Sequence, residues 1–333
     1  MSNTGAERST AINLVAHLNA EMGVGEVARR LISLLSATGI DLNLVPFEVS
    51  KARKEHKGLY KTSDFLAGSG TVSCVNADQL GALVAFFGIS PGNRKFHNGF
   101  WAWELEDFPE NFAPAAKLLD EVWTISTFAQ KSIEKTVSTR VRTVKVPVPL
   151  PNAKTKVNRK DLGIPEKTFL VTSSFDLNSD IERKNPAGSI KAFLKSFPKP
   201  SGATLFLKSI NGDKHTTRFS ELQELAQGRE DIVFFDGYLD QYQNKGLLEL
   251  SDIYLSLHRA EGYGLNLADA MARKTAVIAT GYSGNLDFMD EDSSVLVPIE
   301  KVAVTNYAGM RVNSKWAEPD IDFASRKLRD LFD

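Results

Sequence analysis

The chain has 333 residues, of which 42% are hydrophobic and 24% are charged, so it has the composition of a globular protein and the length for two hydrophobic cores. Its 40 basic and 41 acidic side chains give a formal net charge of -1, which excludes the overall basic character of many nucleic-acid-binding proteins. The one cysteine, Cys74, excludes an intramolecular disulfide and a cysteine-based metal site.

Membrane and export signals are also missing from the sequence pattern. No apolar run reaches the roughly 18 residues that a membrane-spanning helix needs. The polar residues 1–10 do not resemble a secretory signal. Together with the cysteine content, these features predict a cytoplasmic protein.

In the first half of the chain, short apolar runs alternate with amphipathic helical segments, a pattern typical of parallel α/β domains. The segment 50–70 is polar and rich in lysine, and we expect a long loop there. The predicted strands are 11–18, 42–47, 72–75, 96–102 and 121–125. The predicted helices are 26–37, ended by Gly39, then 79–87, and one that is capped near Ser126 or Thr127.

A proline-rich break then separates two halves. Pro147, Pro149, Pro151 and Pro165 bracket the polar segment 152–160, which predicts a linker. Beyond it the alternation restarts, with strands 169–175, 204–208, 232–235, 253–257 and 276–280 and helices 186–197, 217–226, 241–250, 265–272 and 321–332. We therefore predict two doubly wound α/β domains, residues 1–149 and 150–333, with ligands bound at the carboxyl ends of the strands.

The segment Leu255–Met271 carries the strongest functional signal. Gly262 and Gly264 allow backbone amides to approach a ligand closely, and the helix that follows offers its positive N-terminal end to a phosphate. Glu261 and Asp269 are eight residues apart, and carboxylates accept hydrogen bonds well from the hydroxyls of a sugar and a ribose. The alternative is that the two glycines form a tight turn and that Glu261 caps the helix.

A second polar cluster, Ser173–Pro186, lies between a predicted strand and a predicted helix. Within it Arg183 and Lys184 have the charge to neutralise a diphosphate. An ordinary solvated charge pair is the alternative.

In the first half, Gly23 and Gly25 lie between a strand and a helix, which is a weak dinucleotide signal on its own. Trp103 and Glu104, with Trp101, are candidates for the side of the site that receives a sugar, because aromatic faces stack on sugars; packing in the core remains open for the tryptophans. The five histidines show no metal-ligand spacing. Among them His17 and His258 lie near strand ends and could line the cleft; a structural or exposed position is the alternative.

Taken together, four segments resemble the retaining family-four glycosyltransferases (glycosyl transferases group 1). These are the acidic-x7-acidic pattern from Glu261 to Asp269, Ile278–Met289, Gly99–Pro109 and Gly23–Arg30, in the family's order over nearly the whole chain. The resemblance implies the GT-B architecture, in which two Rossmann-like domains face a cleft. It implies sugar transfer from a nucleoside diphosphate sugar with retention of the anomeric configuration, as in polysaccharide biosynthesis.

By this resemblance, the catalytic residues are Glu261, Lys184 and Arg183. It also implies that Glu261 binds hydroxyls of the donor sugar and that Asp269 binds the ribose of the nucleotide. The expected donor-binding residues are Ser173, Lys208, Gly262, Tyr263, Gly264, Leu265 and Asp269. The expected acceptor-side residues are Gly23, Gly25, Trp103 and Glu104. The family usually has glutamate where this chain has Asp269, and it has a strand-end arginine for which Arg183 or Lys208 would substitute. No cofactor and no metal are expected.

The expected partners are the sugar nucleotide and a glycan or lipid-linked acceptor. The basic run Lys51–Lys61 is a candidate for contact with an anionic membrane at its inner face, or it is a solvated loop. In the family a C-terminal helix usually crosses back to the first domain, whereas here the last predicted helix is 321–332. The rival functions are a non-catalytic sugar-nucleotide or glycan-binding protein, a sugar-nucleotide epimerase and, from Gly23 and Gly25 alone, a nicotinamide-dependent oxidoreductase.

Overall fold

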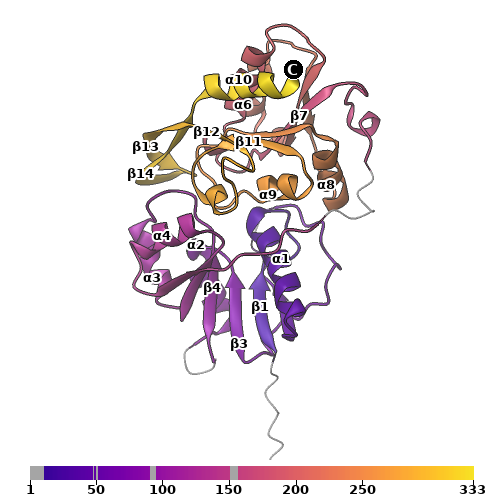
Figure 1. Ribbon diagram of the computed structural model, residues 1–333. Helices are drawn as coiled ribbons and strands as arrows, with labels where there is room; N and C mark the ends of the chain where they lie inside the picture. Colours follow the sequence, from indigo (N-terminus) through magenta and orange to yellow (C-terminus); the bar gives the residue numbers. More distant parts are fainter. Residues whose placement is uncertain (1–10, 48, 50–51, 91–94, 151–156) are drawn as a thin grey trace, which may run out of the picture. The chain divides into compact units, whose positions relative to one another are not determined.

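The computed structural model describes residues 11–47, 49, 52–90, 95–150 and 157–333. The chain divides into two compact units, Met1–Pro147 and Val148–Asp333, close to the predicted boundary between residues 149 and 150. Figure 1 shows a parallel sheet and flanking helices in each unit. The units are described one at a time.

The described part of the N-terminal unit contains a six-stranded parallel sheet in the order β2-β1-β3-β4-β5-β6. Its strands are β1 (Ile12–Ala16), β2 (Leu42–Pro46), β3 (Gly70–Cys74), β4 (His97–Trp101), β5 (Glu121–Thr124) and β6 (Arg140–Thr143). Its helices are α1 (Gly23–Ala37), α2 (Ala77–Phe87), α3 (Ala113–Ala116) and α4 (Thr127–Glu134). Ser126 caps α4 by accepting a hydrogen bond from the amide of Ala129 (3.1 Å), as predicted.

The sequence prediction missed strand β6 and helix α3 of this unit and placed the start of helix α1 too late. Strand β6 was not predicted, because this edge strand alternates two exposed arginines with a single buried valine and has no apolar run. Helix α1 begins at Gly23 rather than at the predicted Glu26. Glycine is a weak helix former, so the apolar helical spacing that begins at Val27 does not reveal the first turn of α1.

The C-terminal unit repeats this plan, with a parallel sheet of six described strands in the order β12-β11-β10-β7-β8-β9. These are β7 (Phe169–Asp176), β8 (Ala203–Ile210), β9 (Ile232–Asp236), β10 (Ile253–Ser256), β11 (Ala276–Thr280) and β12 (Val295–Val297). Its helices are α5 (Ile181–Lys184), α6 (Pro186–Ser196), α7 (Thr216–Leu225), α8 (Gln241–Leu250), α9 (Leu265–Ala272) and α10 (Ile321–Phe332). In both units the strands of a parallel sheet alternate with helices along the chain, which confirms the predicted α/β class.

The last helix, α10, packs against its own unit, beside α6 (Figure 1). The Ser196 hydroxyl donates a hydrogen bond to the Ser325 carbonyl (2.8 Å), and the Phe332 ring packs edge-on against Phe169 and Phe197. These contacts fix α10 over the buried apolar residues of the sheet, of which Val171, Leu205, Leu255 and Ile278 are examples.

A two-stranded antiparallel hairpin, formed by β13 (Ile299–Tyr307) and β14 (Met310–Pro319), lies between β12 and α10 in the sequence and was not predicted. Its turn residues Ala308 and Gly309 have φ angles of 49° and 79°. Tight hairpins favour turns with positive φ, but asparagine or glycine normally takes the first turn position. Because alanine takes that position here, the residue pattern does not predict the turn.

Within the described residues, no helix combines the length and apolar character that a membrane crossing requires.

Candidate functional site

The site of the C-terminal unit forms where the strand order of its sheet reverses. The chain runs β7, β8, β9 toward one edge and then β10, β11, β12 toward the other, so β7 and β10 are neighbours at the centre. In open α/β sheets, ligands bind outside the carboxyl ends of the strands at such a point, and the loops that leave β7 and β10 lie there.

After β7 the chain forms the four-residue helix α5, which carries Arg183 and Lys184. The Asp180 carboxylate caps it by accepting a hydrogen bond from the Arg183 amide (3.0 Å). Asn185 ends it with φ at 51°, and Pro186 starts α6. The prediction had only the second helix. A residue before proline avoids the α-helical region, and asparagine tolerates the left-handed one, so Asn185-Pro186 makes a corner between two helices.

The side chains of Lys184, Arg183 and Glu261 meet, although 77 residues separate Lys184 from Glu261. The Lys184 ammonium forms an ion pair with the Glu261 carboxylate. The Arg183 guanidinium lies 3.4 Å from the other carboxylate oxygen and donates a hydrogen bond to the Ala260 carbonyl (2.8 Å). The side chains of Arg183 and Glu261 are only 7% and 12% exposed, so water screens their attraction weakly. The three predicted catalytic residues thus form one cluster, while their roles stay a prediction.

This cluster fixes the charge of Glu261. Burial alone would raise the pKa of the carboxyl, but the positive charges of Lys184 and Arg183 outweigh it and lower the pKa to about 2. Glu261 is therefore a carboxylate at neutral pH. It can accept hydrogen bonds from hydroxyls but has no proton to donate.

The segment Ser283–Asn285 holds the loop that carries Glu261. The Glu261 amide donates to the Ser283 hydroxyl (2.8 Å), and the Gly284 amide donates to the Glu261 carbonyl (2.9 Å). Ser283 has φ at 77°, a strained value for a residue other than glycine. A Cβ atom at Gly284 would lie 2.1 Å from the Gly262 carbonyl oxygen, so only glycine fits there. The resemblance included this segment but gave it no role.

His258 is fully buried beneath this loop. Its ring nitrogens lie 3.0 Å from the Ser256 hydroxyl and 3.2 Å from the Asn285 side-chain oxygen. Burial is the main influence on the pKa of this imidazole and lowers it, so the ring is neutral at pH 7. This burial means that His258 supports the loop and does not line a ligand surface.

Helix α9 follows the loop with its N-terminus at the same end of the sheet. Gly264 precedes it with φ at 89°, a conformation that glycine adopts without strain. The Tyr263 ring packs against the Phe288 ring, with 4.8 Å between the ring centroids. Asp269 is within α9 as predicted, but it is only 7% exposed. Its assignment to the ribose stays a prediction.

Two predicted donor residues, Ser173 and Lys208, lie inside strands β7 and β8. The predicted strand 204–208 continues as β8 to Ile210, and β7 continues to Asp176, because Ser209 and Ile210 pair with Phe175 and Asp176. Ser173 and Lys208 are consequently buried within the sheet.

In the N-terminal unit, packing accounts for Gly25 and the two tryptophans. A Cβ atom at Gly25 would lie 2.7 Å from the carbonyl oxygens of both His17 and Ala20, so glycine lets this loop cross α1 closely. Trp101 is fully buried and stacks on Phe108, and Trp103 also packs on that ring and donates from its indole to the Asp107 carbonyl (3.0 Å).

The other two candidates of this unit, Gly23 and Glu104, lie at least partly at the surface. No atom lies within 4 Å of a Cβ built at Gly23, and Glu104 is partly exposed. The acceptor-side assignment of Gly23, Gly25, Trp103 and Glu104 stays a prediction.

In the basic run Lys51–Lys61, Lys51 lies outside the described residues, and Arg53 pairs with Glu55 (2.6 Å). A group of three or more histidine, cysteine or acidic side chains that could hold a metal ion is not found in the described parts of the chain.

Comparisons with known proteins bear on the fold and on the family. Residues 154–304 match the family model described as Glycosyl transferases group 1. Comparison with the curated proteins finds no match. A glycosyltransferase from Rickettsia africae is similar in structure, with 13% identity, a TM-score of 0.67, and 97% of this chain and 88% of that chain covered.

Two further solved structures are bound to ligands. HepE from Anabaena, in complex with UDP and glucose, has 14% identity and a TM-score of 0.60, with 87% of this chain and 86% of that chain covered. TarM from S. aureus, a complex that includes UDP, has 12% identity and a TM-score of 0.56, with 78% of this chain and 48% of that chain covered, so the present chain spans about half the length of TarM. The chain therefore has the GT-B fold, and its residues 154–304 are similar to the glycosyl transferases group 1 family.

Proposed function

We propose that this chain transfers a hexose-type sugar from a nucleoside diphosphate sugar to a glycan, lipid-linked or other acceptor, with retention of the anomeric configuration. The observation that supports this most is the buried cluster of Glu261, Lys184 and Arg183 at the carboxyl ends of β7 and β10. It places two cations and one fixed carboxylate together, as a diphosphate and an adjoining sugar require.

The cluster suits the two chemical ends of such a donor. The ammonium of Lys184 and the guanidinium of Arg183 would neutralise the diphosphate, aided by the amides at the start of α9. Glu261, held as a carboxylate, would accept hydrogen bonds from the sugar hydroxyls. The UDP and glucose bound to HepE support a donor of this class.

The proposed reaction depends on positioning and on stabilisation of the leaving group. The bond between the anomeric carbon and the diphosphate oxygen breaks through an oxocarbenium-like transition state, while the acceptor oxygen bonds to the same face of that carbon. The acceptor proton passes to the departing phosphate oxygen. Glu261 is ionised, so it is not the acid that protonates the leaving group. Lys184 and Arg183 would stabilise the leaving charge, which is why we propose a reaction independent of metal ions.

A panel of nucleotide sugars tests this function, with thermal shift and release of nucleoside diphosphate measured together. We expect one donor to stabilise the protein and to release its diphosphate, and we expect Glu261→Gln to abolish the release. Arg218→Ala, an exposed arginine of α7, serves as the matched control and should retain it. The absence of any shift with every donor, or full activity of Glu261→Gln, would refute the proposal.

A non-catalytic sugar-nucleotide-binding protein is the second candidate. The observation in its favour is Asp269, which is shorter than the family's usual glutamate and only 7% exposed. This candidate would be favoured if a nucleotide sugar gave a thermal shift but released no diphosphate, whether the acceptor offered was water, a glycan or a lipid-linked acceptor.

A further inference from the structure

Arg259 satisfies the carbonyl groups at the end of helix α5, which carries Arg183 and Lys184. A helix leaves its last carbonyls without partners inside the helix, and a cation near that end is favourable. In α5 the Arg259 guanidinium donates to the Glu182 carbonyl (2.6 Å), and the Arg259 amide donates to the Arg183 carbonyl (2.7 Å). One residue of the loop after β10 thus binds two consecutive carbonyls beside the cations of the site.

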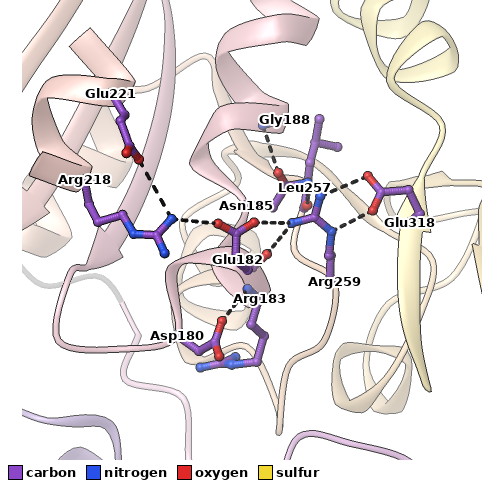
Figure 2. Close-up of polar contacts among 10 residues, drawn as sticks. All are labelled: Asp180, Glu182, Arg183, Asn185, Gly188, Arg218, Glu221, Leu257, Arg259 and Glu318. Atoms are coloured by element: carbon purple, nitrogen blue, oxygen red, sulfur yellow. Dashed lines mark hydrogen bonds and ion pairs between the residues drawn. The ribbon is translucent and has the colours of Figure 1, made fainter. Parts of the chain in front are cut away.

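The same arginine is bound to the β13–β14 hairpin. Its Nε and Nη2 donate to the two carboxylate oxygens of Glu318 in β14, at 2.7 and 3.2 Å. The Ala317 amide donates to the Arg259 carbonyl (2.8 Å), and the Trp316 ring lies 5.7 Å from the guanidinium carbon. Figure 2 shows Arg259 between Glu182 of α5 and Glu318 of β14.

The hairpin also reaches the start of α5. The Ala308 amide, at the hairpin turn, donates to the Asp180 carboxylate (3.0 Å), while the other oxygen of that carboxylate caps α5. Two separate points of the hairpin, its turn and its last strand, therefore hold the two ends of a helix of only four residues. Such a short helix has little stability of its own, so outside contacts must fix its conformation.

We propose that Arg259 is a positioning residue: bound to Glu318, it fixes α5 so that Lys184 and Arg183 face the donor diphosphate. This proposal rests on the proposed function for the identity of the ligand. Its structural part, the fixing of α5 by Arg259 and the hairpin, stands on the contacts alone. Arg259 is not in ion-pair contact with Glu261, so its effect on a donor would pass through α5.

Arg218 provides a matched control. It binds the same glutamate, Glu182, from the opposite side (3.2 Å), as Figure 2 shows. It is about half exposed, and its guanidinium pairs with the side chains of Glu182 and Glu221 rather than with α5 carbonyls. Loss of Arg218 removes a positive charge near Glu182 without removing the link between α5 and the hairpin.

The first measurement is hydrogen exchange of the ligand-free full chain, by mass spectrometry, on the peptide that covers residues 177–186. The amides of Arg183, Lys184 and Asn185 are bonded within this turn. In Arg259→Ala and in Glu318→Ala we expect their exchange to accelerate by about tenfold or more, the factor that corresponds to loss of one charged hydrogen bond. Arg218→Ala should leave it unchanged, and in all three variants the β7 peptide 169–176, which exchanges through unfolding of the whole unit, should stay much slower than the peptide 177–186. Unchanged exchange of 177–186 in Arg259→Ala overturns the proposal.

The second measurement is the affinity for UDP and for UMP, by calorimetry. We expect Arg259→Ala to lower the ratio of UDP to UMP affinity by about tenfold, because the second phosphate loses its positioned cations. A residue that only stabilises the fold would weaken both nucleotides equally, and that result overturns the positioning role. If the wild-type chain binds no nucleoside diphosphate of the donor panel, the proposed function is refuted, and the hydrogen exchange decides the role of Arg259 by itself.

Discussion

Replacing Glu261 with glutamine should strongly destabilise the C-terminal unit. The change keeps the shape of the side chain but removes the charge that Lys184 and Arg183 share. The pKa of Glu261 falls from its ordinary value of 4.5 to about 2 in the folded chain. A shift of this size corresponds to about 3 kcal/mol of interaction with the carboxylate. Removal of one partner of a buried ion pair typically costs about 3–5 kcal/mol.

Hydrogen exchange of the β7 amides at pH 7 measures this effect, because buried central strands exchange through unfolding of their own unit. About 3 kcal/mol predicts on the order of a hundredfold faster exchange in Glu261→Gln. Asp322→Asn is the matched control: Asp322 also pairs with a lysine, Lys195, but its side chain is 57% exposed. Exposed pairs contribute little, so this variant should exchange like the wild type. If Glu261→Gln exchanges no faster than Asp322→Asn, the carboxylate does not compensate buried cations and the reasoning fails.

Three further predictions follow from the same cluster and its supporting loop. The pKa of Glu261 is lower in the folded than in the unfolded chain, so the carboxylate stabilises the fold fully above about pH 5, and this stabilisation is lost as the pH falls toward 2. Calorimetric unfolding from pH 7 to pH 3 should show this loss of stability in the wild type. The stability of Glu261→Gln should depend less on pH. Gly284→Ala should abolish UDP binding in calorimetry, because the new Cβ atom would lie 2.1 Å from the Gly262 carbonyl oxygen. Gly81→Ala is the control: the space around Gly81 in α2 is open, so this variant should retain UDP binding, and its free energy of unfolding should rise by about 0.5–1 kcal/mol. Lys184→Met should lower the affinity for UDP at least about tenfold, since a charged contact to phosphate is lost. Glu261→Gln should bind UDP as well as the wild type does. Equal losses of affinity in both variants would contradict the assigned roles.

The sequence predicted the central elements of both units well, because strands of a parallel sheet are buried on both faces and form continuous apolar runs. The bounds of α8, α9, β11 and α10 agree with the predicted ranges. The missed elements lack such a signal. Strand β12 has three residues, β6 is polar, and α5 is a single turn that ends at a proline boundary.

The candidate site was predictable only in part, for a similar reason. Glu261 and the pair Arg183-Lys184 stand out locally, by their position after predicted strands and by resemblance. Their contact across 77 residues, and that of Arg259 with Glu318 across 59, arise from the order of strands in the sheet, which one sequence does not specify. Ser283 illustrates a second limit, since nothing in its residue type announces a φ of 77° or a bond to the Glu261 amide.

The cluster also explains how one site could tolerate both the absence and the presence of an anionic donor. Without a ligand, the Glu261 carboxylate compensates Lys184 and Arg183, which would be costly to bury alone. A diphosphate would take over these cations, and the carboxylate would then exchange its ion pairs for hydrogen bonds from sugar hydroxyls. Each charge keeps a partner in both states, so donor binding need not leave a buried ion uncompensated. UDP has no sugar beyond the diphosphate, so it would compete with Glu261 for the cations without offering hydroxyls in return. For this reason Glu261→Gln should not weaken UDP, although the same change should abolish sugar transfer.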